Sequence, residues 1–240
     1  MCDRIEPVAH GIAVRASAVP DLWDYNVLRV PGATAASAAA LAAVADAALA
    51  GLDHRMVEVF DEAAGERLAP GFRALGYEVW RNEWRLHDER TALVPRPARV
   101  EQVDDGKVYD LRCDWSVEEG FAEPEEGGRS LERAAGVVAE RRGGVAITLA
   151  AFDPWPAGFA DLRVRPPAGA EIAGLYVSAS HRGRGLGAAL LDGAVAVARD
   201  GLPTGDLWIE ADADGWPREL YASRGLATVW LQHKFVRRPG

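Results

Sequence analysis

The run from Glu171 to Leu191 constrains the fold of this chain more than any other segment. It begins with apolar, β-favouring residues over 172–177, which predict a strand, and ends in an apolar periodic stretch over 184–200, which predicts a helix. Three glycines alternate in the connecting loop: Gly183, Gly185 and Gly187. Because glycine has no Cβ, such a loop lets the backbone come close to a ligand. The segment therefore predicts a strand–loop–helix unit with a binding site at the loop.

The predicted helix start makes this loop a candidate anion site. The first N–H groups of a helix lack intrahelical partners, and the helix dipole is positive at that end. A pyrophosphate fills such a site well. Arg182 and Arg184 add positive charge for phosphate oxygens. We therefore expect a phosphate-bearing ligand here, against the alternative of a tight turn that binds nothing.

Two other phosphate-binding motifs fit the loop less well. Gly183, Gly185 and Ala188 satisfy the loose dinucleotide pattern. In that motif, however, the glycines follow the strand directly, whereas residues 178–182 intervene here. The chain after the loop is also too short to build a doubly wound sheet. A P-loop is excluded because no Lys-Ser or Lys-Thr follows the glycines.

The pattern Arg182-x-x-Gly185-x-Gly187, after a strand that ends in Leu175-Tyr176-Val177, resembles motif A of the GNAT superfamily of N-acetyltransferases. Downstream, the segment 220–226 (LYASRGL) is similar to the family's Leu-Tyr-x-x-x-Gly-Phe segment. The resemblance is close over 171–236 and extends over 98–170 only by the order of predicted elements. It implies an α+β fold in which helices flank a mixed, mostly antiparallel sheet.

The resemblance also implies that acetyl-CoA is the cosubstrate. Its pantetheine arm would lie between the strands 171–177 and 207–210 and bond to the backbone of Leu175, Tyr176 and Val177. The N–H of Val177 would hold the developing oxyanion. The pyrophosphate would lie on a loop with these residues: Arg182, Gly183, Arg184, Gly185, Leu186 and Gly187. Asp214 and Leu226 depart from the family pattern, so the resemblance implies no cofactor contact from the last helix.

Tyr221 is the candidate general acid, because its place in the motif matches a tyrosine that protonates the leaving thiolate in the family. The alternative is a tyrosine that only packs in the core. Glu171 is the candidate general base, since it lies eleven residues before Arg182, where some family members carry a catalytic glutamate. Strand alternation would place Glu171 on one face with Ala173, Leu175 and Val177. A solvated carboxylate at a strand start is the alternative, and Asp161 and Glu210 are further candidate bases.

The N-terminal half repeats the predicted order of the C-terminal half. Its strand, helix, strand, helix and strand are expected over 23–30, 35–50, 55–60, 64–75 and 79–86. The loop Pro31–Thr34 has one glycine and no arginine, and Phe72 stands where the other copy has Tyr221. We therefore expect a degenerate copy over 1–94 and an acetyltransferase domain over 99–240. The degenerate copy would either wall the substrate site or cover a sheet edge.

The formal net charge of −9 argues against nucleic acid or an anionic membrane as the partner and leaves room for a cationic amine. Cys2 and Cys113 form neither a disulfide framework nor a zinc site, and no other ligand spacing indicates a metal. No leader pattern opens the chain, so we expect a cytoplasmic protein. Lysine occurs only at Lys107 and Lys234 while arginine and alanine are abundant, a bias that indicates a GC-rich, bacterial genome. The oligomeric state stays open, with a monomer as the default.

The sequence thus predicts an acyl-CoA-dependent N-acyltransferase that moves an acetyl group from acetyl-CoA to a primary amine of a small molecule or peptide. The alternative from another class is a catalytically silent acetyl-CoA sensor. Both need the phosphate loop, and they differ in whether an acid and a base are present.

Overall fold

The computed structural model describes residues 2–88, 91, 97–120, 128–129, 145–164, 169–201, 206–215 and 217–238. The chain forms two compact units. Unit 1 comprises residues 1–84, 211–215 and 228–240, and unit 2 comprises residues 85–210 and 216–227. The sequence also predicts a helix over 130–141, and these residues lie outside the described part of the chain. Within the described part of the chain, no helix is long and apolar enough to span a membrane.

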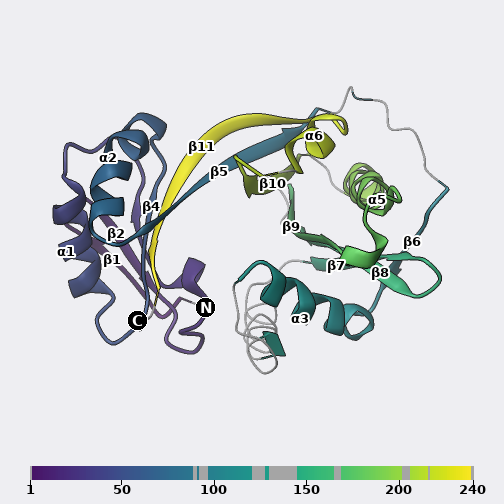
Figure 1. Cartoon of the computed structure of the whole chain (residues 1–240), viewed down its shortest axis with the longest axis horizontal. Coiled ribbons are helices and arrows are strands. Elements are labelled where there is room, and N and C mark those ends of the chain that lie inside the picture. Colours follow the sequence, from purple (N-terminus) through teal and green to yellow (C-terminus); the bar gives the residue numbers. More distant parts are fainter. Residues whose placement is uncertain are drawn as a thin grey trace. The chain divides into compact units, whose positions relative to one another are not determined.

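Unit 1 is an α+β unit whose strands follow the order β1-β2-β3-β4-β11-β5 (Figure 1). Its elements are β1 (Arg4–Val8), β2 (Gly11–Arg15), β3 (Val27–Val30), α1 (Ala38–Ala48), β4 (Arg55–Val59), α2 (Glu62–Ala74), β5 (Glu78–His87) and β11 (Leu226–Arg237). β3 and β4 are parallel, and the pairs β1–β2, β2–β3 and β4–β11 are antiparallel. Strands β5 and β11 also contribute their other ends to unit 2.

Local signals explain where the helices of unit 1 begin and end. The Ser37 side chain accepts a hydrogen bond from the N–H of Ala40 at 3.2 Å and caps α1. The Asp61 carboxylate accepts one from Ala64 at 2.8 Å and caps α2. Gly51 and Gly76 follow the two helices with φ of +85° and +80°, a conformation that favours glycine. Both helices were predicted, and the caps move their starts by two or three residues.

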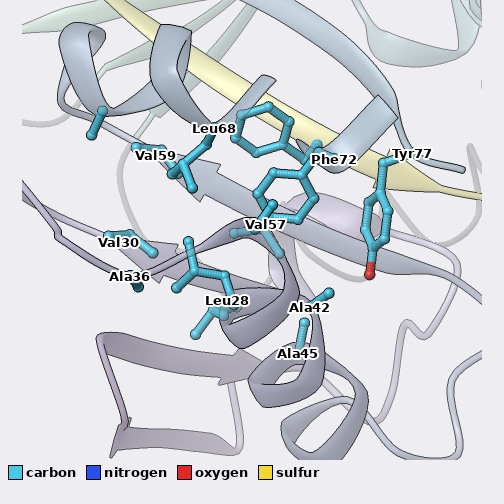
Figure 2. Close-up of a cluster of buried hydrophobic side chains, with 14 of the residues drawn as sticks. Leu28, Val30, Ala36, Ala42, Ala45, Val57, Val59, Leu68, Phe72 and Tyr77 are labelled. Atoms are coloured by element: carbon cyan, nitrogen blue, oxygen red, sulfur yellow. The ribbon is translucent and has the colours of Figure 1, made fainter. Parts of the chain in front are cut away.

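The core of unit 1 lies between the helices and one face of the sheet (Figure 2). Leu28 of β3, Val57 of β4 and Leu68 of α2 are buried there. Phe72 is fully buried and stacks on Phe235 of β11 with ring centroids 4.0 Å apart. Full burial of side chains of this size contributes roughly 1.5–3 kcal/mol each. The last strand of the chain is therefore part of the N-terminal core.

Unit 2 carries the strand order β10-β9-β8-β7-β6. Its elements are β6 (Arg99–Val103), α3 (Tyr109–Glu118), β7 (Val145–Phe152), β8 (Pro156–Val164), β9 (Ala170–Val177), α5 (Leu186–Gly201), β10 (Leu207–Asp212) and α6 (Pro217–Ala222). The last two residues of β10 belong to unit 1. The pairs β6–β7, β7–β8 and β8–β9 are antiparallel, whereas β9–β10 is parallel. The predicted mixed, mostly antiparallel sheet is confirmed.

Helices α3 and α5 cover opposite faces of the unit 2 strands (Figure 1). On one face, Trp115 of α3 packs edge-on against Phe159 of β8 at 5.9 Å. On the other, α5 passes so close that a Cβ added to Gly193 would lie 3.3 Å from Leu149 of β7. The loop that precedes α5 begins at the carboxyl end of β9, which is Val177.

The two units do not follow the predicted division into residues 1–94 and 99–240. β11 pairs with β4, with Phe235 opposite Val57, so the C-terminal strand completes the N-terminal unit. Strand pairing of this kind joins residues almost 180 positions apart, and no local pattern in the sequence specifies it.

Candidate active site

Strands β9 and β10 begin as a parallel pair and then part. Their register pairs Ala170, Glu171 and Ile172 with Leu207, Trp208 and Ile209, and it ends there. β9 continues for five more residues to Val177, and β10 runs on through Glu210. Among the described strands, β9 therefore has one neighbour from Ala173 to Val177, which is β8, and its other edge is open.

A β-bulge marks the point at which the strands part. Leu162 of β8 lies opposite Ile172, but Asp161 lies opposite Gly174, so Ala173 is the extra residue. A bulge bends its strand and increases the local twist. The bend lies one residue after the last pair with β10, so it accounts for the opening.

The backbone groups of Leu175 and Val177 point toward the open edge. The N–H of Ser178 bonds to the carbonyl of Ala157 at 2.9 Å, which places Val177 in a non-hydrogen-bonded pair with Gly158. The register is regular from Gly174 to Val177, so Leu175 shares this orientation. The N–H and C=O groups of both residues thus face away from β8, as an added strand-like ligand would need.

The glycine-rich loop has the geometry that the sequence predicts. Gly183 and Gly185 have φ of +75° and +83°. α5 begins at Leu186, and its first intrahelical bond runs from the N–H of Ala189 to the carbonyl of Gly185 at 3.0 Å. The N–H groups at the preceding positions have no intrahelical partner. A Cβ on Gly183 would meet nothing within 4 Å, so the backbone is open to a ligand there.

Both arginines of the loop have partners within the protein. Arg182 donates from Nε to the carbonyl of Val177 at 2.9 Å and forms an ion pair with Glu118. Arg184 pairs with Asp153 at 2.8 Å. Their side chains are 40% and 56% exposed, so each keeps access to solvent. Beside them, Nδ1 of His181 lies 2.8 Å from Ser178 Oγ and 2.9 Å from Ser180 Oγ.

Glu171 does not share a face with Leu175 and Val177, and the expectation that it does was wrong. It lies opposite Arg163, whereas Tyr176 lies opposite Phe159. Residues opposite one another share a face, so the bulge puts Glu171 with Tyr176 on the α3 side. Its carboxylate is 3.8 Å from Arg163 and is partly exposed.

The two other candidate bases have different surroundings. The Asp161 carboxylate accepts two hydrogen bonds from Arg112, at 2.8 and 2.7 Å, and one from Thr148 at 2.9 Å. Both oxygens of this carboxylate are therefore engaged within the protein. Glu210 follows the last residue of β10 that pairs with β9.

Tyr221 lies on α6 and is 6% exposed. The residue before it, Leu220, approaches the first turn of α5, because a Cβ on Gly187 would lie 3.4 Å from Leu220 and 3.8 Å from Val177. The guanidinium carbon of Arg85 lies 5.9 Å from the centre of the Tyr221 ring. The structure thus brings α6, the start of α5 and the end of β9 together.

Asp214 is not a cap of α6. It lies three residues before Pro217, where the helix starts, and accepts a hydrogen bond from Arg81 at 3.1 Å. Within the described residues, no group of three or more potential metal ligands comes together.

The Acetyltransferase (GNAT) family profile matches residues 108–226. This range contains the open strand pair, the glycine-rich loop and α6. Residues 108–226 belong to the GNAT acetyltransferase family. The family and the fold support acyl-CoA-dependent N-acyl transfer in general. None of the curated protein sequences matches the chain.

Solved structures share the fold of this chain at low sequence identity. A functionally unknown conserved protein from Staphylococcus epidermidis has a TM-score of 0.73 at 14% identity, over 100% of this chain and 95% of that one. A GCN5-related N-acetyltransferase from Kribbella flavida has a TM-score of 0.61 at 16% identity, over 99% and 90%. A tandem GNAT protein from the clavulanic acid biosynthesis pathway has a TM-score of 0.57 at 17% identity, over 84% and 69%. These likenesses concern the fold.

One residue at the GNAT site escapes the sequence analysis. Glu118, the last residue of α3, contacts both Tyr176 and Arg182. It stands 64 positions before Arg182 in an acidic stretch, so nothing in its local sequence separates it from its neighbours. Only the packing of α3 on β9 reveals it.

Proposed function

We propose that this protein transfers an acetyl group from acetyl-CoA to a primary amine of a small molecule or peptide. The observation that carries the proposal is the open edge of β9 beside a loop with two left-handed glycines. An extended ligand with a pyrophosphate at one end, such as an acyl-CoA, has the shape and the chemistry for both features.

In this proposal, the edge groups of Leu175 and Val177 bind one part of the ligand and the loop Arg182–Gly187 binds the other. Tyr176 was expected to take part as well, but its pairing with Phe159 directs its backbone N–H and C=O toward β8. The edge takes the amides of the pantetheine arm. The loop takes the pyrophosphate on its unpartnered N–H groups, and Arg182 and Arg184 add charge. Three observations support this division: the ladder orientation of Val177, the start of α5, and the open space around Gly183.

The reaction would be a direct transfer. The neutral amine attacks the thioester carbon, a C–N bond forms, and the carbonyl oxygen becomes an oxyanion held by the N–H of Val177. Collapse breaks the C–S bond, and the thiolate takes a proton from Tyr221. Glu171 is the proposed base, which removes the proton of the amine through water. Leu175, two residues nearer to Glu171, offers an N–H to the same edge and is the alternative oxyanion donor.

The charge of the chain and of the α3 side of β9 indicates the substrate class. The net charge of −9 favours a cationic acceptor, and Glu118 and Glu171 both lie on the α3 side of β9. We therefore propose a small or peptide amine in the cytoplasm of a bacterium, and no nucleic acid. The rival function is a silent acetyl-CoA sensor, which would share the open edge and the loop.

Two measurements separate these functions. Calorimetric titration with acetyl-CoA tests the binding that both require. Release of free thiol from acetyl-CoA over a panel of amines tests the transfer, and a thermal-shift screen with the same amines finds acceptors that bind. Binding without thiol release for any amine supports the sensor. Absence of binding refutes both functions.

A further inference from the structure

Three side chains meet at the carboxyl end of β9, and we call them the Glu118 cluster: Glu118, Tyr176 and Arg182. The Tyr176 hydroxyl donates to Oε2 of Glu118 at 3.0 Å. Arg182 pairs with Oε1 of the same carboxylate. The guanidinium carbon of Arg182 lies 5.7 Å from the centre of the Tyr176 ring. The cluster joins α3, β9 and the glycine-rich loop.

The ion pair of this cluster contributes little to the stability of the fold. The side chains of Arg182 and Glu118 are 40% and 37% exposed, and exposed ion pairs contribute only about 0–1 kcal/mol. Tyr176 is 6% exposed. Burial, and then its hydrogen bond to Glu118, raise the pKa of Tyr176 to about 12. Its hydroxyl therefore stays protonated at neutral pH and holds the carboxylate in one orientation toward Arg182.

Arg182 connects the Glu118 carboxylate to the open edge of β9. Its Nε donates to the Val177 carbonyl at 2.9 Å, and the N–H of the same peptide group, on Ser178, donates to Ala157 at 2.9 Å. The peptide is thus held from both ends at a place where β10 gives no support. A carbonyl oxygen has two lone pairs, so the bond from Arg182 leaves one acceptor site for a ligand.

We propose that Glu118 is a positioning residue for the pantetheine arm of acyl-CoA. It holds Arg182 on the Val177 carbonyl and so fixes the peptide group to which the arm bonds. The inference rests on the proposed function of the edge as an acyl-CoA site. A preorganised edge binds an extended ligand more tightly because less ordering remains to be done on binding.

The test compares two ligands on the variant Glu118→Gln. Glutamine still accepts a bond from Tyr176 but has no charge for Arg182. Calorimetry is done with acetyl-CoA and with adenosine 3′-phosphate 5′-diphosphate, which carries the phosphates without the arm. We expect the Kd of acetyl-CoA to rise about tenfold, the scale of one lost charged hydrogen bond. The Kd of the nucleotide should not rise.

Asp110→Asn is the matched control. It lies on the same helix, is exposed, and undergoes the same change of charge. Both Kd values should stay at their wild-type levels. An equal rise for acetyl-CoA in this variant would attribute the effect to net charge and overturn the inference.

A double variant tests whether Glu118 acts through Arg182. In an Arg182→Gln background, Glu118→Gln should change the Kd of acetyl-CoA by less than about twofold, because coupled residues are not additive. A further tenfold loss, an equal weakening of both ligands, or wild-type affinity in Glu118→Gln would each overturn the proposal.

Failure of the proposed function can be told apart from failure of this inference. If wild-type protein does not bind acetyl-CoA, the function is refuted. The cluster is then tested without ligand, on the amide resonance of Val177. That resonance should move in Glu118→Gln and Arg182→Gln and stay in place in Asp110→Asn. An unmoved resonance in the first two variants contradicts the positioning role.

Discussion

The parallel pair β3–β4 in unit 1 is closed where the parallel pair β9–β10 in unit 2 is open. Val30 and Val59, the last residues of β3 and β4, are still paired, and Phe60 adds a bond to the carbonyl of Val30 at 3.1 Å. β9 and β10 part after Ile172 and Ile209. The order of elements around the two pairs is the same. A shared order of strands and helices is therefore compatible with a site in one copy and a packed core in the other.

The difference extends to the loop and the helix that follow each pair. After β9 come two glycines with positive φ, whereas Pro31–Thr34 after β3 contains Gly32 without that conformation. Phe72 is fully buried against Phe235, while Tyr221 has a polar hydroxyl on the corresponding helix. The N-terminal copy thus uses for packing the positions at which, in our proposal, the C-terminal copy binds a ligand.

The strongest test of this comparison is the variant Gly185→Glu. We expect it to abolish acetyl-CoA binding, because a side chain at φ +83° strains the loop and its charge repels the pyrophosphate. Calorimetric titration measures this. Gly32→Glu, at a position where a Cβ meets nothing within 4 Å, should bind acetyl-CoA normally.

The number of acetyl-CoA molecules bound per chain tests the same comparison. We expect one acetyl-CoA per wild-type chain, and two equivalent sites would show that the N-terminal copy is not degenerate.

A pair of Tyr→Phe variants gives the next largest contrast. Tyr221→Phe should lower turnover roughly a hundredfold and leave acetyl-CoA affinity intact, as loss of a general acid does. Tyr77→Phe in unit 1 should leave turnover unchanged, because the Tyr77 hydroxyl is buried without a hydrogen-bond partner in the described structure. Steady-state kinetics decide the matter. Full turnover in Tyr221→Phe would reduce this tyrosine to core packing.

The residues that precede Gly225 and Gly76 should differ in their contribution to stability. Nε of Arg224 lies 3.4 Å from Asp192 of α5, and both side chains are nearly buried. Arg224→Leu should lower the free energy of unfolding by about 3 kcal/mol, since it removes the cation that faces a nearly buried carboxylate. Leu75 is 42% exposed, so Leu75→Arg should change stability by less than about 0.5 kcal/mol. Chemical denaturation measures both, and equal effects would contradict the contrast.

The smallest expected effect is the response of unit 1 to pH. Burial lowers the pKa of His54 and of His233 from the usual 6.5. Below pH 6.5 the unfolded chain therefore binds more protons than the folded one, and stability falls as the pH falls. Above pH 6.5 both histidines are neutral in the folded and the unfolded chain, and this loss of stability is absent. Thermal midpoints between pH 5 and 7.5 should show this slope.

His233→Phe tests the assignment of that slope. The variant keeps a ring beside Phe235, where the native imidazole stacks with centroids 6.1 Å apart, and removes the titration. Its midpoint should depend on pH less steeply than that of the wild type. An unchanged slope would assign the effect to other groups.

The sequence by itself determined the local features of this protein. The helices α1 and α2, the glycines after them and the loop Arg182–Gly187 depend on the preferences of neighbouring residues, and the sequence predicts all of them. The caps Ser37 and Asp61 are local signals of the same kind, but the predicted helix starts missed them by two or three residues. The family resemblance follows from the same loop. These signals act over a few residues, so a single sequence is enough to find them.

The tertiary structure decided what depends on pairing between distant strands. The extra residue Ala173 turned Glu171 to the α3 face, since a shift of one residue moves a side chain across the sheet. The pairing of β11 with β4 gave the C-terminal strand to unit 1. Glu118 reached Arg182 only because α3 packs on β9. Register and packing are cooperative properties of the whole fold, and local preferences do not specify them.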